Sequence, residues 1–301
     1  MNYLKHFGLR ELPFGITPDT SYFFACRSIQ EALNTLLVAV SNGEGFIKIT
    51  GEVGTGKTLL CRKFLATLGQ DWLAAYLPNP SINPRTLLFA LAEELGCEPE
   101  VHLDEHRLMR AINGRLLALA DTGRRVIVCI DEAQAMPIKT METVRLLTNL
   151  ETEKRKLLQV VLFGQPELDE KLARPEIRQL RQRITFEHRM APLTSAETAH
   201  YLAHRLIVAG YSGGGVFSGS ATRALHRASG GVPRLVNILA HKTLMLAYGR
   251  GVRCVRWRDA RAAVRDTSAA AAAPRRALAW LGLAGMAGLV AGGGWLRGWL
   301  P

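Results

Sequence analysis

The fold of this chain is decided by the run Gly51-Glu52-Val53-Gly54-Thr55-Gly56-Lys57-Thr58. The run matches the pattern GxxxxGK[ST] in full, between an apolar strand-like stretch at 46–50 and a helical pattern at 57–68. Its glycines let the backbone curl so that N–H groups point inward, and the following helix adds partial positive charge at its N-terminus. We therefore predict an ATP-binding P-loop, in which Lys57 contacts the β- and γ-phosphates and the Thr58 hydroxyl binds Mg²⁺.

A second group of residues supports this prediction. The apolar stretch at 125–130 ends directly in Asp131-Glu132. A buried strand that delivers two carboxylates at its C-terminal end is typical of the Walker B arrangement, in which Asp131 holds Mg²⁺ through water and Glu132 orients and deprotonates the attacking water. The alternative is a solvated acidic turn, which the neighbouring P-loop makes the weaker interpretation. The pair predicts hydrolysis in addition to binding.

The order of apolar patterns predicts the architecture. Strand-like stretches lie at 46–50, 72–77, 125–130, 157–163 and 185–190, and helical patterns separate them. Strands that alternate with helices indicate a parallel sheet with helices on both faces. After residue 190 the pattern is helical only, beginning with the capping box Thr194-Ser195-Ala196-Glu197. We predict an α/β P-loop core over 41–190, with a five-stranded sheet, and a small all-helical lid domain over 191–266.

Composition bounds the class of protein. Hydrophobic residues make up 48% and charged residues 21% of the 301 residues, which excludes a disordered chain. The net charge of +12 favours an acidic partner, either nucleic acid or an anionic membrane surface. Five scattered cysteines form neither a CxxC pair nor a zinc spacing, which indicates reduced thiols in a cytoplasmic compartment.

The C-terminal region has a different composition. Residues 277–296 carry no charge, and their number suits a helix that spans a bilayer. Arg275 and Arg276 precede the stretch and only Arg297 follows it, so the positive-inside rule places the folded domains in the cytoplasm. We predict a linker at 267–276 and a transmembrane helix at 277–297 in a bacterial inner membrane. Because Gly and Ala make the stretch only modestly hydrophobic, a peripheral or partner-docked tail is the alternative.

Further motifs accompany these features. They are Tyr3-Leu4-Lys5-His6-Phe7-Gly8-Leu9, Pro13-Phe14, Thr17-Pro18-Asp19, Phe23-Phe24, Asp131-Glu132-Ala133-Gln134, Phe163-Gly164-Gln165-Pro166-Glu167-Leu168 and Leu180-Arg181-Gln182-Arg183-Ile184. With the P-loop, they make the chain similar to the ExeA/GspA-type AAA+ ATPases of bacterial secretion and pilus assembly, above all to those of mannose-sensitive haemagglutinin (MSHA, type IV) pilus biogenesis. The resemblance covers about residues 1–265.

The resemblance implies roles for three residues of the core. Gln165 matches the sensor 1 position, where an amide holds the lytic water or the γ-phosphate; the alternative is a plain helix start at Pro166. Arg181 and Arg183 lie where AAA+ proteins supply an arginine finger to a neighbouring subunit, and the fixed fork of arginine suits that role. The sequence does not choose between the two arginines, and a solvated basic face is the alternative.

The resemblance also implies roles outside the core. Gly231-Val232-Pro233-Arg234 matches the sensor 2 motif, so Arg234 is expected to reach the γ-phosphate and couple hydrolysis to lid motion. An ordinary first-turn arginine is the alternative, although the helix dipole disfavours one there. The N-terminal segment, residues 1–40, is expected near the nucleotide. Simple core packing of its phenylalanines is the alternative.

These expectations combine into one function. The chain is expected to be an ATP hydrolase that works as a homo-oligomeric ring or dimer, with ATP and Mg²⁺. With inner-membrane assembly proteins it would drive assembly of a type IV (MSHA-like) pilus or a type II secretion-like complex. A DNA-binding ATPase of the transposition-helper type is an alternative, motivated by the arginines at 250–265. A third interpretation, an ATP-switched scaffold with negligible turnover, leaves Glu132 without a task.

Overall fold

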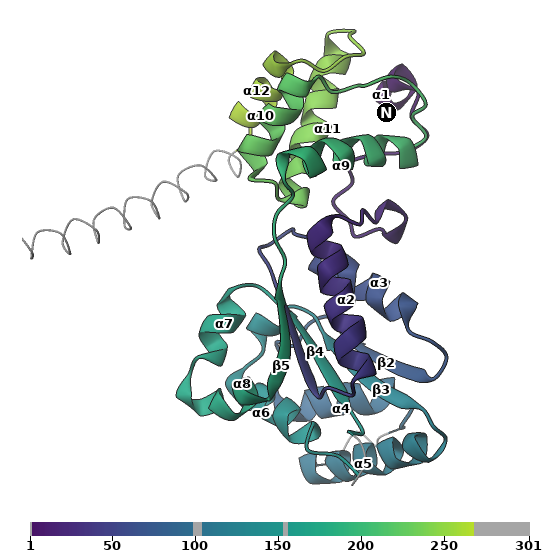
Figure 1. The fold of residues 1–301 in the computed structure, drawn as a ribbon, viewed down its shortest axis with the longest axis vertical. Helices are drawn as coiled ribbons and strands as arrows, with labels where there is room; N and C mark the ends of the chain where they lie inside the picture. Colours follow the sequence, from purple (N-terminus) through teal and green to yellow (C-terminus); the bar gives the residue numbers. More distant parts are fainter. Residues whose placement is uncertain (1, 99–103, 153–155, 268–301) are drawn as a thin grey trace, which may run out of the picture. The chain divides into compact units, whose positions relative to one another are not determined.

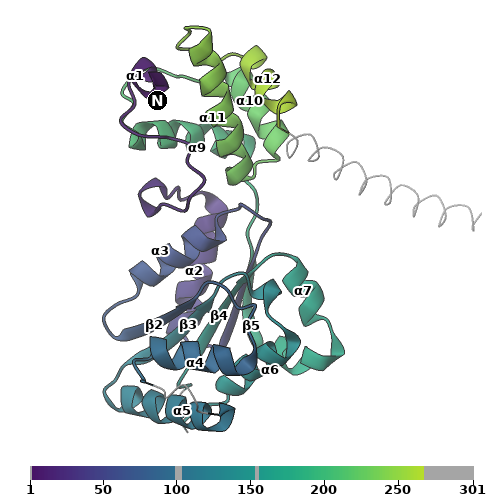
Figure 2. The same cartoon turned by 180° about the vertical axis from the view of Figure 1, so that it is seen from behind.

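The computed structural model describes residues 2–98, 104–152 and 156–267. The chain divides into two compact units, seen from opposite sides in Figures 1 and 2. Among the described residues, the sheet unit is Pro18–Ala191, and the helical unit joins residues 2–17 to residues 192–267. This division lies within two residues of the predicted boundary at 190, but it splits the expected segment 1–40 between the two units.

The sheet unit is built on five parallel strands. They are β1 (Phe46–Thr50), β2 (Trp72–Leu77), β3 (Arg125–Ile130), β4 (Gln159–Gly164) and β5 (Ile184–Arg189). Their order along the sheet is β2-β3-β4-β1-β5, and every neighbouring pair is parallel. The predicted five-stranded parallel sheet is confirmed. Because all five strands run the same way, their C-terminal ends meet at one edge, where ligands bind in open α/β sheets.

Helices cover both faces of this sheet. They are α2 (Arg27–Ser41), α3 (Lys57–Thr67), α4 (Pro84–Glu94), α5 (Glu105–Asp121), α6 (Ile138–Leu147), α7 (Glu167–Leu172) and α8 (Arg178–Arg183). Helices α2 and α3 lie over one face, and α4, α5 and α6 lie on the opposite side (Figures 1 and 2). Alternate side chains of β3 point to opposite faces of the sheet. Val126 and Val128 belong to the apolar cluster that includes α4 and α5, whereas Ile127 and Cys129, which alternate with them, are buried as well, so both faces of the strand are covered.

The helical unit contains α9 (Ser195–Val208), α10 (Gly219–Ser229), α11 (Pro233–Gly249) and α12 (Trp257–Arg265). The predicted capping box begins α9, because the Thr194 hydroxyl accepts from the Glu197 N–H and the Glu197 carboxylate accepts from the Thr194 N–H. The helical region after the sheet is therefore confirmed. Its core is apolar, with Leu225, Leu239 and Leu244 fully buried.

The first seventeen residues belong to this helical unit. Helix α1 (Asn2–Phe7) packs on α11, where the Tyr3 hydroxyl lies 3.2 Å from Nδ1 of His241. The guanidinium of Arg205, in α9, donates to the carbonyls of Pro13 and Gly15. The buried ring of Phe14 meets Phe217 edge-on. For Phe14, the packing interpretation is thus the one that the contacts support. A position of the N-terminal segment near the nucleotide stays a prediction.

The predicted transmembrane helix at 277–297 lies outside the described residues, as does all of the linker after Thr267. Within the described ranges, no helix combines the length and the apolar character needed to cross a bilayer.

Candidate active site

The P-loop connects β1 to α3. Gly54 and Gly56 have φ angles of +83° and +101°, in the left-handed region that favours glycine. At Gly51 a side chain is excluded for a different reason: an added Cβ would lie 2.9 Å from Oγ1 of Thr55 and 3.0 Å from Cβ of Met190. The glycines of the motif are therefore required by the shape of the loop. The loop has the curled backbone that the sequence predicts for a phosphate cradle.

The side chain of Lys57 lies within this loop and is bonded to its backbone. Its side chain is 5% exposed, and Nζ donates to the carbonyl oxygens of Gly51, at 2.8 Å, and Glu52, at 3.1 Å. Burial lowers the pKa of Lys57, although the nearby carboxylates of Glu132 and Asp131 act in the opposite direction. A buried ammonium group with two neutral carbonyl partners can exchange them for phosphate oxygens, which carry negative charge.

Thr58 and Asp131 form the second part of the site. The Thr58 hydroxyl donates to Oδ2 of Asp131 at 2.6 Å, and the Tyr76 hydroxyl approaches the same oxygen at 3.4 Å. Burial and the Asp131 charge raise the pKa of Tyr76 to about 12, so its hydroxyl stays a donor. Oδ1 of Asp131 accepts from the backbone N–H of Glu132 at 3.0 Å. A hydroxyl and one carboxylate are hard oxygen ligands of the kind that Mg²⁺ takes together with substrate phosphates, so these residues fit Mg²⁺.

Glu132 is held by two amide side chains. Its Oε2 accepts from Nε2 of Gln134 at 2.5 Å and from Nε2 of Gln165 at 2.9 Å. Burial alone would raise the pKa of Glu132, but the two amide donors and the charge of Lys57 outweigh it and lower the pKa below its ordinary value. The carboxylate is thus held ionised, as a proton acceptor must be.

The backbone at Glu132 is unusual. Its φ of +52° makes it the sole non-glycine residue with positive φ in the described ranges. Such a conformation costs free energy and persists where the surroundings impose it, often at active sites. Here the turn that follows is fixed by Lys171, whose Nζ donates to the carbonyls of Gln134 and Met136.

Gln134 is a site residue to which the sequence analysis assigned no role. Its Oε1 accepts from the backbone N–H of Gln165 at 3.0 Å while its Nε2 donates to Glu132, so it bridges the ends of β3 and β4. The sequence pattern that could have indicated a role for Gln134 is a polar amide between two apolar residues, in Ala133-Gln134-Ala135. Gln165 directly follows β4, and α7 begins two residues later, at Glu167, so the local structure agrees with the helix-start interpretation. The sensor 1 role of Gln165 stays a prediction.

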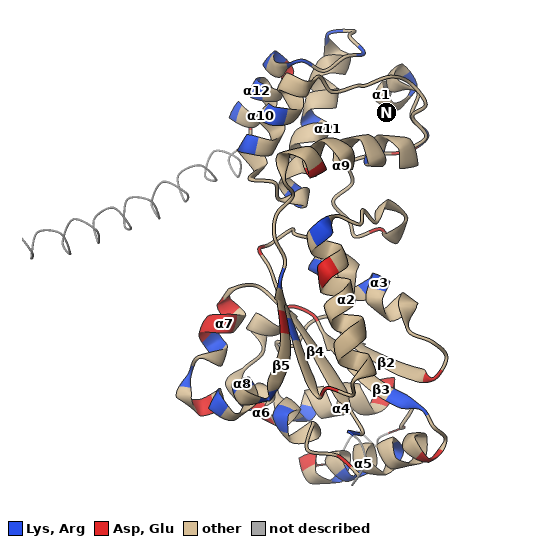
Figure 3. Ribbon diagram, in the orientation of Figure 1, with Lys and Arg blue, Asp and Glu red and all other residues tan. Residues whose placement is uncertain are grey.

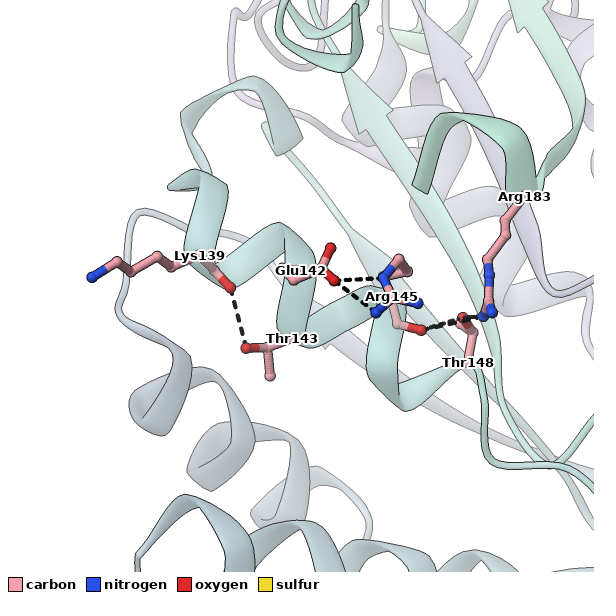
Figure 4. A network of polar contacts seen from close by, with 6 residues as sticks. All are labelled: Lys139, Glu142, Thr143, Arg145, Thr148 and Arg183. Atoms are coloured by element: carbon pink, nitrogen blue, oxygen red, sulfur yellow. Dashed lines mark hydrogen bonds and ion pairs between the residues drawn. The ribbon is translucent and has the colours of Figure 1, made fainter. Parts of the chain in front are cut away.

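The two arginine-finger candidates have different surroundings. Nη1 of Arg183 lies 3.4 Å from the carbonyl oxygen of Arg145 and 3.3 Å from Oγ1 of Thr148, so Arg183 ties α8 to the end of α6 (Figure 4). Arg145 is itself paired with Glu142 at 2.7 Å. Arg181 is exposed, and in the described part of the chain its side chain makes no hydrogen bond or ion pair. Neither arginine contacts the P-loop of its own chain within the described residues.

Arg234 lies in the first turn of α11, in the helical unit, and its side chain is exposed. The motif before it has a structural requirement: Gly231 has a φ of +75°, and a Cβ there would lie 2.1 Å from the carbonyl oxygen of Leu193. Lys57, Thr58 and Glu132 all belong to the sheet unit. The sensor 2 role of Arg234 therefore stays a prediction.

Comparison with known proteins supports the fold. A family model described as an AAA domain matches residues 40–172. Among solved structures, the ORC2 protein of Aeropyrum pernix superposes with a TM-score of 0.59 at 17% identity, covering 83% of this chain and 72% of that one. The Holliday junction branch migration motor RuvB of Thermotoga maritima gives a TM-score of 0.51 at 13% identity, covering 85% and 73%. At these identities, both show the fold alone.

One curated relative is more similar in sequence. The general secretion pathway protein A of Aeromonas hydrophila is 42% identical over 249 residues, which cover 83% of this chain. The same alignment covers 45% of that relative, so this chain matches less than half of its length. The matched AAA domain, the α/β P-loop fold and this relative together identify the chain as an AAA protein of the GspA/ExeA type.

Proposed function

We propose that this chain binds ATP with Mg²⁺ and hydrolyses it to ADP and phosphate. The observation that carries the proposal is the meeting of three groups at one edge of the sheet: the Lys57 ammonium, the Thr58–Asp131 pair and the amide-held carboxylate of Glu132. The first binds phosphate oxygens and the second suits the metal ion. The third accepts the proton of the attacking water.

The residues divide the chemistry as follows. Lys57 and the P-loop N–H groups bind and orient the phosphates. Mg²⁺, when bound by Thr58 and Asp131, neutralises developing negative charge on the transferred phosphoryl group. Both amide donors of the Gln134–Gln165 pair bond to Oε2 of Glu132, which leaves Oε1 as the acceptor for the proton of water.

The direct test uses Lys57→Ala in the full chain. Loss of the ammonium group removes charge-assisted bonds to phosphate, so nucleotide affinity and phosphate release should both fall sharply. Lys63→Ala, a lysine on α3 outside the P-loop, is the matched control and should hydrolyse ATP normally. A Lys57→Ala protein with the wild-type rate would contradict the proposal.

We infer that the active form is a homo-oligomer and that Arg181, not Arg183, is the finger. Arg181 is exposed and free to reach a neighbouring subunit, whereas Arg183 is bonded to α6. Mixing separates the roles: Arg181→Ala supplies an intact P-loop, and Lys57→Ala supplies an intact finger. Each variant alone should be inactive, and their mixture should regain part of the activity. A mixture as inactive as its components contradicts a shared site.

We further propose that hydrolysis drives the assembly of a type II secretion-like complex or a type IV (MSHA-like) pilus at the inner membrane, with a C-terminal helix as the anchor and the folded units in the cytoplasm. The 42% identity to general secretion pathway protein A supports this process. Deletion of the gene and complementation with Glu132→Gln test it. Loss of secretion or of surface pili, restored only by the wild-type chain, identifies the process; unimpaired secretion and piliation contradict it.

A further inference from the structure

The helical unit carries a strongly basic surface outside the candidate active site. We call it the arginine face, and its members are Arg250, Arg253, Arg256, Arg258, Arg261 and Arg265. All six side chains are exposed. The stretch 250–265 contains one acidic residue, Asp259, which is buried, and Asp266, which follows it, pairs with Lys242 at 2.8 Å. Figure 3 shows basic positions following one another along α10 and α12.

All six arginines come from one stretch of the chain, which is bound to the segment before α10. Val255 is fully buried, and its backbone pairs with the chain before α10: its N–H donates to Val216 at 2.7 Å, and its carbonyl accepts from Ser218 at 3.0 Å. Along α12, Arg258, Arg261 and Arg265 are spaced by three and four residues, which places them on one side of the helix. The loop and the helix thus present their arginines from a fixed scaffold.

Most of this charge is not neutralised by the protein. Asp259 is 3% exposed and is occupied by the Arg250 guanidinium and the Arg256 backbone N–H. Arg253 and Arg258 form no ion pair with any described residue. Arg261 stacks on Trp257, with its guanidinium carbon 5.0 Å from the ring centroid. Uncompensated arginines at one surface attract an anionic partner.

The arginine face is also hollowed and partly apolar. A hollow of about 1080 Å³ is lined by four of its arginines, together with two serines, Cys254 and two apolar side chains, Val252 and Trp257. Val252 is 38% exposed and Trp257 is 45% exposed. Arginines that surround a hollow suit phosphate groups, and exposed tryptophan and valine beside them suit the boundary between headgroups and acyl chains.

We propose that the arginine face docks on an anionic phospholipid surface, with headgroup phosphates in the hollow and Trp257 at the interface. This rests on the membrane attachment proposed above, because the chain continues from α12 through Arg275 and Arg276 to the uncharged stretch 277–296. Docking would hold the helical unit against the bilayer. Nucleic acid would use the arginines but would leave Val252 without a partner.

The expected strength follows from the charges. A basic residue close to an anionic bilayer strengthens binding about fivefold at physiological salt. Reversal of two arginines should therefore weaken docking by more than about 25-fold, because each attraction is replaced by a repulsion. The attraction should weaken further as salt shortens the Debye length.

The test uses Cys254, which is exposed in the hollow, whereas Cys26, Cys61 and Cys129 are buried. The full chain, with half-buried Cys97 replaced by alanine, carries an environment-sensitive fluorophore on Cys254. It is reconstituted into nanodiscs of phosphatidylcholine, with or without phosphatidylglycerol. We expect emission to move to shorter wavelength, with quenching by lipid-bound quenchers, only in discs that contain phosphatidylglycerol, and reversal at high salt.

Two variants and a second measurement complete the design. Arg253→Glu with Arg258→Glu should abolish the shift, whereas Arg110→Glu with Arg174→Glu, an equal charge change in the sheet unit, should retain it. Without any fluorophore, the rate at which a maleimide modifies Cys254 should fall in anionic discs compared with neutral ones. Equal rates in the two discs would contradict docking whether or not the label disturbs the surface.

The outcomes separate docking from attachment. If the protein co-migrates with the discs but the fluorophore on Cys254 shows no response to anionic lipid, the membrane anchor is supported and docking by the arginine face is contradicted. Protein that fails to enter discs, yet shows the Cys254 shift with free anionic vesicles, supports docking and contradicts the anchor. A shift induced by DNA and not by phosphatidylglycerol would overturn the proposal in favour of nucleic acid.

Discussion

The charged side chains of the site at the sheet edge are paired with other groups of the protein, whereas several of those on the arginine face are not. At the sheet edge, each charged group has a close partner: Lys57 has two carbonyls, Asp131 has a hydroxyl, and Glu132 has two amides. On the arginine face, Arg253 and Arg258 are exposed and unpaired in the described part of the chain. The first arrangement fixes atoms in place, as catalysis requires. The second acts at a distance and needs no fixed geometry.

The largest effect should come from the sheet edge. Glu132→Gln keeps the shape of the side chain and removes the proton acceptor, so the hydrolysis rate should fall by about 10²–10⁴-fold. ATP binding should persist, because Lys57 and the P-loop are unchanged. Single-turnover hydrolysis and equilibrium nucleotide binding measure the two effects separately. Equal losses of binding and hydrolysis would show that Glu132 serves the structure of the loop and not the chemical step.

The helical unit contains one arginine that behaves like the sheet-edge charges. Arg205 is 7% exposed, and its guanidinium bonds to the carbonyls of Pro13 and Gly15 and to the Tyr201 hydroxyl. Arg205→Met should lower the free energy of unfolding by about 3 kcal/mol, because buried acceptors lose a charged donor.

Urea unfolding of the full chain, followed by circular dichroism, measures this change. Arg223→Met, on an exposed position of α10, is the control and should shift stability by less than about 0.5 kcal/mol. If both variants show the same free energy of unfolding, the bonds from Arg205 to Pro13 and Gly15 do not stabilise the packing of the first seventeen residues on α9.

The Gln134–Gln165 pair predicts a pH effect. Its hydrogen bonds lower the pKa of Glu132, so the carboxylate remains ionised at lower pH than an ordinary glutamate. The stabilisation is present above the ordinary pKa and is lost as pH falls through the lowered one. Gln134→Ala should therefore move the acidic limb of the kcat–pH profile to higher pH. An unmoved limb, with a uniformly lower rate, would assign Gln134 to orientation alone.

The same comparison explains what the sequence predicted. Lys57, Thr58 and Asp131 were predictable because each lies at a strand end or helix start that its own neighbours specify, and parallel strands bring those ends to one edge. The role of Gln134 depends on the left-handed turn at Glu132 and on Lys171, a residue from another helix. Periodicity carries no information about such contacts.

The N-terminal segment shows the same limit. Arg205 bonds to Pro13 and Gly15, which precede it in the chain by 192 and 190 positions, and no local pattern predicts that pairing. The basic stretch 250–265 was visible as composition. Its arrangement into one hollowed face depends on the pairing of Val255 with the chain before α10, which only the structure shows.

The smallest predicted change in stability separates the two arginines of α8. Arg183→Ala removes two long hydrogen bonds between α8 and α6 and should cost about 1 kcal/mol of stability. Arg181→Ala removes an exposed side chain and should leave the unfolding midpoint unchanged. In phosphate release by the assembled protein, the order should reverse, with Arg181→Ala the more damaging. A stable but inactive Arg183→Ala protein would instead make Arg183 the residue that reaches the neighbouring subunit, and its bonds to α6 would then have to break on assembly.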